Sequence, residues 1–279
     1  MSQKLSSIHP LLVMLLLAGA GLAGCDRPAE PAAPPPEAPQ PKAPVAPATP
    51  LPPPALSRAD LLTAMDAAAS DYAAGRTPEG RALAGRRFAI RQSFGCGGPS
   101  PPAGEDSSGD GVARWSWGTE RKTIQIRLRP GNWKESALIE AAAADLEAAE
   151  GFWLTRPWLR ADGCPGLQGD PIAGQTSSPS PETVGLAAVI EPGGSRLGRR
   201  SGQAYSFTVR GTGDQPAPAP IGGYRLVLEG RLTNFSDGRA IHCRATSLDQ
   251  RPVCVAAVLL DRVAFENAQG STLSEWRPG

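Results

Sequence analysis

Histidine is scarce in this sequence of 279 residues, which holds only His9 and His242. A Ser–His–Asp or Cys–His nucleophilic site in the main part of the chain would need His242 as its base. His242 adjoins Cys243 on an expected strand, and the sequence has no Gly-x-Ser-x-Gly elbow. The P-loop and the Gly-x-Gly-x-x-Gly motif are absent as well. We therefore expect neither this type of hydrolase nor a phosphate-cradling loop.

An excess of charge of either sign is also lacking. Residues 1–24 contain one Lys and no acid, so the rest of the chain carries 27 basic and 27 acidic side chains. Electrostatic binding to nucleic acid needs a basic footprint, and none is present. We expect no nucleic-acid partner.

Only one long apolar run is present, over residues 11–22, and Lys4 precedes it without any acid. This order is typical of a secretory signal peptide. A transmembrane helix needs about 20 apolar residues, and this run meets Asp26 and Arg27 first. We interpret residues 1–24 as a cleaved signal peptide.

The run ends in Leu22-Ala23-Gly24-Cys25, which resembles the bacterial lipobox. The resemblance implies that Cys25 becomes an acylated first residue, carrying diacylglycerol and palmitate-type chains that anchor the protein to a membrane. The alternative is an ordinary secretory peptide that leaves Cys25 as an unpaired thiol. Asp26 resembles the residue that keeps lipoproteins of enteric bacteria in the inner membrane. We expect the periplasmic face of a Gram-negative membrane, the inner one favoured and the outer one open.

Residues 25–56 consist mainly of Pro and Ala and cannot build a core. Proline fixes its own backbone and biases its predecessor toward extended geometry, which favours a polyproline II spacer. Such a tether would reach up to roughly 90 Å. Clearance from the lipid surface is the favoured role, and reach toward peptidoglycan or a partner is the alternative.

Four further cysteines have no Cys-x-x-Cys spacing, so we expect no metal site and no cofactor. In an oxidising compartment two disulfides are expected, with three pairings formally open. A hairpin register centred between Leu248 and Asp249 places Cys243 opposite Cys254, and close antiparallel neighbours satisfy disulfide geometry. Cys96 and Cys164 then pair by elimination.

Residues 57–279 are long enough for a substantial domain. Ser57 and Asp60 form a capping-box pattern that predicts a helix to about Ala74. A second helix is predicted over residues 133–150 from the spacing of its apolar residues, Leu138, Ala142, Leu146 and Ala149.

Elsewhere the apolar residues alternate with a period of two. Expected strands include those around 88–94 and 124–128, and later ones at 184–190, 205–209, 224–232, 240–245 and 253–265. We predict an α+β fold with a largely antiparallel sheet and two helices in the N-terminal half. Residues 165–181 are poor in large apolar side chains and form a long loop or a domain boundary. Two small domains, 57–164 and 183–279, are therefore the alternative.

Two features bear on function. Strict alternation puts Asp261 on a buried strand face, which favours a bulge or an arginine partner, with a functional carboxylate as the alternative. Trp115 and Trp117 share one strand face; core packing is the favoured interpretation, and a glycan contact is the alternative. We expect a non-enzymatic binding or scaffolding module for an envelope protein or for a glycan such as peptidoglycan. A carboxylate-based envelope hydrolase is the alternative.

Overall fold

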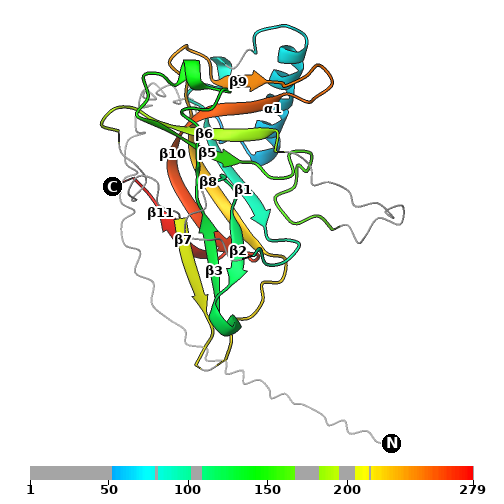
Figure 1. Cartoon of the computed structure of the whole chain (residues 1–279), viewed down its shortest axis with the longest axis vertical. Coiled ribbons are helices and arrows are strands. Elements are labelled where there is room, and N and C mark those ends of the chain that lie inside the picture. Colours follow the sequence, from blue (N-terminus) through cyan, green and yellow to red (C-terminus); the bar gives the residue numbers. More distant parts are fainter. Residues whose placement is uncertain are drawn as a thin grey trace, which may run out of the picture. The chain divides into compact units, whose positions relative to one another are not determined.

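The computed structural model describes residues 52–78, 81–101, 109–166, 182–194, 205–213 and 215–278. The expected signal peptide, the lipobox with Cys25, and all but the last residues of the tether lie outside this part of the chain, as does most of the loop after Cys164. Residues Leu51–Gly279 form one compact unit. Figure 1 shows its elements in chain order.

One α-helix, α1 (Arg58–Ala73), opens this unit, as the capping box predicted. The amide of Ser57 donates to the Asp60 carboxylate at 2.9 Å, and the amide of Asp60 donates to the Ser57 hydroxyl at 3.3 Å. These bonds satisfy two amides that a helix start leaves without partners. Leu61, Leu62 and Met65 are fully buried, so α1 packs one face on the core.

Eleven strands are present among the described residues. Eight form one sheet in which β1, β8, β10, β6, β5 and β4 follow one another and β9 and β11 also pair with β10, and three form a second sheet in the order β2, β3, β7. Their bounds are β1 Arg87–Phe94, β2 Arg114–Trp117, β3 Thr123–Leu128, β4 Gly131–Asn132, β5 Ala148–Trp153, β6 Val184–Ile190, β7 Tyr205–Arg210, β8 Tyr224–Leu232, β9 Ile241–Arg244, β10 Val253–Asn267 and β11 Thr272–Trp276. The described residues also form three short 3₁₀ turns: η1 Arg81–Leu83 between α1 and β1, η2 Thr119–Arg121 between β2 and β3, and η3 Glu140–Ala142 between β4 and β5.

The long strand β10 holds the larger sheet together. Its first half pairs in parallel with β6 and antiparallel with β9, while its second half pairs antiparallel with β8 and β11. Strand β8 in turn pairs with β1 over all eight residues from Arg87 to Phe94. Strands from both halves of the sequence therefore share one sheet, and apart from the β6–β10 pair every pairing of the described strands is antiparallel.

The main core joins α1 to the facing sides of both sheets. Ile124, Ile126 and Leu128 of β3 are fully buried in the same cluster as Phe88 and Ile90 of β1. Each such side chain contributes about 1.5–3 kcal/mol by leaving water. A smaller core lies on the other side of β5, β6 and β10.

The second helix, predicted over residues 133–150, is absent, and that prediction was wrong. Its apolar residues Ile139, Ala142 and Leu146 instead pack against Ala187 and Val189 of β6 from an irregular segment with only the turn η3. Residues from Ala148 onward form β5, which pairs with β6. Tertiary packing outweighs helix propensity here because β6 is buried on both faces and needs a neighbouring strand.

Both disulfides are present with the expected pairing. Cys96 joins Cys164 across 68 residues, and Cys243 joins Cys254 across 11. Cys243 and Cys254 lie directly opposite each other in the β9–β10 ladder, as the hairpin register predicted.

Candidate functional site

The structure places Trp115 in the core. The residue is 4% exposed and its ring contacts those of Trp117 and Tyr224 at centroid distances of 5.5 and 6.3 Å. Trp117 packs against the same core and is only partly buried. Core packing, the favoured interpretation, therefore holds for Trp115, and the alternative of a glycan contact is excluded there because a buried ring offers no face to a sugar.

Asp261 lies in a β-bulge and not on a buried face. Leu260 pairs with Gly230 and Arg262 pairs with Glu229, so Asp261 is the additional residue and the alternation shifts there. Its side chain is 41% exposed and lies 3.8 Å from the guanidinium of Arg231. The bulge and the arginine partner account for this acid, and it gives the hydrolase hypothesis no support.

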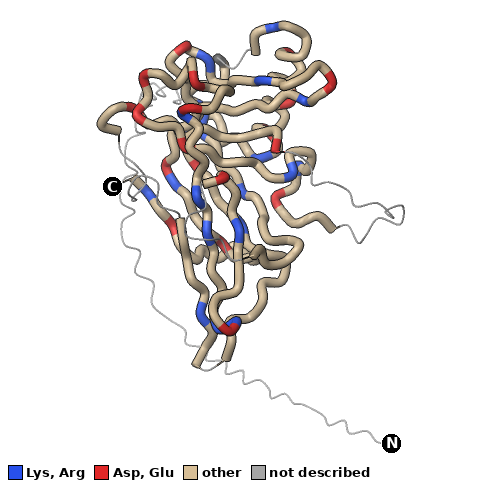
Figure 2. Tube along the Cα trace, in the orientation of Figure 1, with Lys and Arg blue, Asp and Glu red and all other residues tan. Residues whose placement is uncertain are grey.

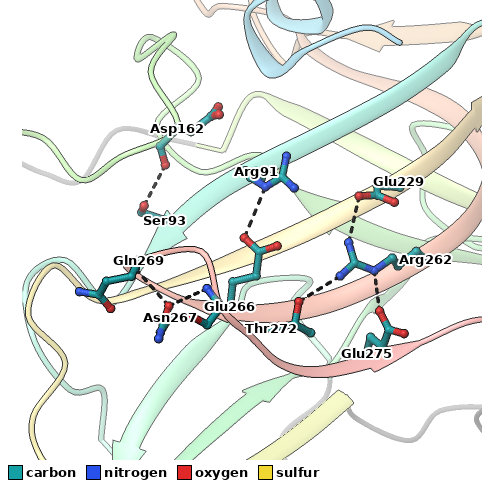
Figure 3. A network of polar contacts seen from close by, with 11 residues as sticks. Arg91, Ser93, Asp162, Glu229, Arg262, Glu266, Asn267, Gln269, Thr272 and Glu275 are labelled. Carbon is teal, nitrogen blue, oxygen red and sulfur yellow. Dashed lines mark hydrogen bonds and ion pairs between the residues drawn. The ribbon is translucent and has the colours of Figure 1, made fainter. Parts of the chain in front are cut away.

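A polar network links β1, β8, β10 and β11 and includes Arg262, the residue after Asp261 (Figure 3). The buried Arg262 donates to Glu229 at 3.0 Å and to Glu275 at 2.8 Å, and Arg91 lies 3.4 Å from Glu266. Hydrogen bonds from Arg262 lower the pKa of Glu275. Figure 2 shows basic and acidic residues interleaved along the described chain. This face is a mutually compensated set of charges.

His242 contributes to packing. Its Nε2 lies 3.1 Å from the Asp237 carboxylate, and its ring meets that of Phe235 edge-on at 4.9 Å. Within the described ranges, no three His, Cys, Asp or Glu side chains gather closely enough to hold a metal ion.

Three exposed apolar side chains lie on α1 or on loops that contact it. Among the described residues, the exposed large apolar side chains are Tyr72, Trp158, Ile221, Leu248 and Leu259. Tyr72 lies on α1, Trp158 on the loop that follows β5, and Leu248, fully exposed, on the loop between β9 and β10. Figure 1 shows the orange β9–β10 loop beside the blue helix.

Asp66 of α1 connects these two loops. Its carboxylate forms ion pairs with Arg160, two residues after Trp158, and with Arg251, three residues after Leu248. We call the area formed by Asp66, Tyr72, Trp158, Arg160, Leu248 and Arg251 the Asp66 surface. Sequence reasoning missed it, because 94 and 185 residues separate the paired charges.

Buried Arg58 fixes the loop after β5 to the start of α1. Its guanidinium donates to the carbonyls of Thr155 at 2.7 Å, Arg156 at 3.1 Å and Leu159 at 3.3 Å, and to the Gln92 side chain at 3.2 Å. Burial, and next the charge of Arg156, lower the pKa of Arg58 to about 10. The carbonyls compensate the cation by solvating it in place of water.

Each disulfide braces one of these loops. Cys164 lies in the connection from β5 to β6 and is joined to Cys96, while Cys243 and Cys254 close the base of the β9–β10 loop. A braced loop loses less conformational freedom when a ligand orders it. The exposed Trp158 and Leu248 are therefore carried by preorganised segments.

A hollow of about 540 Å³ lies between α1 and the β9–β10 loop. Its lining includes apolar groups, hydroxyls and an amide but no charged side chain: Tyr72, Ala73, Gly75, Ala245, Thr246, Ser247, Leu248, Gln250 and Pro252. The arrangement can accept an apolar side chain with hydrogen-bonding groups at its edge.

No helix in the described residues has the length and apolar character needed to cross a bilayer. Comparison of the chain with protein-family models, with curated proteins and with solved structures finds no match.

Proposed function

We propose that this protein is a lipid-anchored envelope protein that binds a partner protein through the Asp66 surface without catalysing a reaction. The observation that carries the proposal is the exposure of Trp158 and Leu248 on two disulfide-braced loops that a single carboxylate, Asp66, joins. The lipobox at Cys25 supports the anchor, and the tether supports a role at a distance from the membrane.

The composition of the Asp66 surface is that of a protein interface. Aromatic residues and arginine are enriched in the centres of interfaces, and a few of them carry most of the binding free energy. Exposed apolar residues scattered singly need no explanation, but a gathered set marks an interaction site. Tyr72 and Leu248 line one hollow, and Trp158 lies on the loop that Arg160 joins to Asp66 of the same helix.

The charges indicate what the partner presents. Arg160 and Arg251 share the one carboxylate of Asp66, so the three groups together carry one positive charge. The hollow beside them has no charged lining. We infer that the partner is a protein segment with an apolar side chain next to a carboxylate, which would fill the hollow and complete the charge balance.

Capture from an envelope extract tests the proposal. The full chain would be compared with Trp158→Ser, Leu248→Ser and Ile221→Ser, the last a control because Ile221 is 89% exposed outside the Asp66 surface. We expect the wild type and the control to capture the same protein. The captured amount should fall about tenfold with Trp158→Ser and with Leu248→Ser. Equal capture by all four variants would contradict the proposal.

The anchor needs its own test. Labelling cells with a fatty-acid analogue should label the wild-type chain and leave Cys25→Ser unlabelled, with the variant released from membranes. Separation of the two membranes would then show whether Asp26 favours the inner one. A labelled Cys25→Ser chain would contradict the assignment.

A further inference from the structure

Trp133 and Trp153 form an aromatic pair at the end of β4 and β5. Their ring centroids are 4.6 Å apart at an interplanar angle of 57°, and both residues are only partly buried. The helix predicted over residues 133–150 would have begun at Trp133; instead Trp133 directly follows β4, and Trp153 is the last residue of β5, which pairs with β4. This pair belongs neither to the Asp66 surface nor to the Trp115–Trp117 contact.

Three glycines hold the Trp133 ring against the sheet. A Cβ atom would lie 2.0 Å from the ring at Gly151, 2.5 Å at Gly185 and 2.6 Å at Gly131. Glycine within a strand marks a close approach of another group to the backbone. The ring therefore lies across β4, β5 and β6 in a position that any other residue at these sites would disturb.

Two threonine hydroxyls beside the pair have no hydrogen-bond partner in the described part of the chain. They belong to Thr155 and to Thr183, which is 4% exposed. The bond from the Leu154 amide to the Val184 carbonyl, 2.9 Å, continues the β5–β6 ladder beyond Trp153 and Gly185. That register puts both threonines on the Trp153 face. A buried polar atom without a partner costs about 1–3 kcal/mol and calls for a ligand or water.

Two carboxylates lie at the edge of the same area. Asp110 precedes Gly111, whose carbonyl accepts the Trp153 amide at 3.0 Å, and Glu182 precedes Thr183. Partial burial, and next the charge of Asp110, raise the pKa of Glu182. Asp110 also pairs with Arg114, so the three groups carry one net negative charge.

We propose that Trp133, Trp153, Thr155, Thr183, Asp110 and Glu182 form a binding site for an uncharged sugar ring of a glycan. A sugar presents a C–H face that packs on an aromatic ring, and hydroxyls that donate to carboxylates and exchange hydrogen bonds with the threonines. The net negative charge disfavours acidic saccharides. The site stands independently of the Asp66 surface, since the two share no residue.

Titration of the full chain with two neutral tetrasaccharides, tetra-N-acetylchitotetraose and maltotetraose, tests this site by tryptophan fluorescence and calorimetry. We expect one of them to bind with a Kd below about 1 mM. Trp153→Phe and the double variant Asp110→Asn/Glu182→Gln should each weaken binding about tenfold. Trp158→Ala is the matched control and should bind like the wild type, because Trp158 lies on the Asp66 surface.

Absence of binding of either tetrasaccharide at about 10 mM would overturn the proposal. Equal binding by the wild type and the carboxylate double variant would overturn it too. The carboxylate double variant leaves both tryptophans and the glycines that contact Trp133 unchanged. It therefore tests the proposal even if Trp153→Phe fails to fold. If Trp158→Ala were the only variant to lose sugar binding, the sugar would bind at the Asp66 surface, and the site proposed here would be refuted.

Discussion

Asp66 on α1 and Arg251 on the β9–β10 loop form an ion pair across 185 residues of sequence. Together with Arg160, this pair joins two loops to one helix. Exposed ion pairs contribute little to global stability, so their consequence here is the relative position of the loops that carry Trp158 and Leu248.

Asp66→Asn should release both loops while keeping the fold. The free energy of unfolding should fall by no more than about 1 kcal/mol, because the three side chains are substantially exposed. Amide hydrogen exchange should speed up in residues 154–164 and 245–252, and partner capture should fall. Asp71→Asn is the control, since Asp71 pairs with Arg76 on the same helix end. Unchanged exchange in both loops would count against the role of Asp66.

Removing the Cys243–Cys254 disulfide should weaken partner binding as well as lower the free energy of unfolding. Cys243→Ala/Cys254→Ala opens an 11-residue separation, for which chain entropy predicts a loss of about 3 kcal/mol. The β9–β10 loop then has to be ordered on binding, so the partner should dissociate faster. Urea unfolding and dissociation kinetics measure the two effects. A destabilised variant with wild-type dissociation would show that the loop takes no part in binding.

Asp261→Asn should change little. Asp261 is a bulge residue, 41% exposed and 3.8 Å from Arg231, so its loss should cost less than about 1 kcal/mol. Partner capture and sugar binding should both match the wild type. Any hydrolytic activity of the envelope protein that disappears with this substitution would restore the hydrolase hypothesis.

Glu182 should give stability a pH dependence. Its pKa is raised above the ordinary value of 4.5, so the folded chain holds this proton more tightly than the unfolded chain. The resulting stabilisation is complete below the unfolded pKa and is lost as pH rises through the folded one. Glu182→Gln lacks this dependence, and its stability relative to the wild type should increase from about pH 4 to about pH 7. Urea unfolding measures both free energies. A difference between Glu182→Gln and the wild type that stays constant across this pH range would contradict the raised pKa of Glu182.

The sequence predicted those elements that depend on residues close together in the chain. The capping box of Ser57 and Asp60 marked the start of α1, and alternation marked β6 and β8 at their observed bounds. The hairpin register paired Cys243 with Cys254 correctly. Each of these signals lies within a few residues, or within one hairpin, so the sequence alone contains it.

Features that depend on distant partners were not predictable in this way. Ala142 and Leu146 have helical spacing, yet the same residues also fit the flat surface of Ala187 and Val189, and only the fold selects between the two. The bulge at Asp261 depends on the pairing of β10 with β8. The Asp66 surface and the Trp133–Trp153 pair arise only when loops and strands far apart in sequence meet.

The most direct test of the central claim is site-specific photocrosslinking in the native envelope. A photoreactive amino acid would replace Leu248 in the full chain, and Ile221 in the control, since both side chains are almost completely exposed. If the Asp66 surface binds a partner, position 248 should give one crosslinked protein of defined mass and position 221 should give none. No crosslink at position 248, or the same crosslinks from both positions, would contradict it.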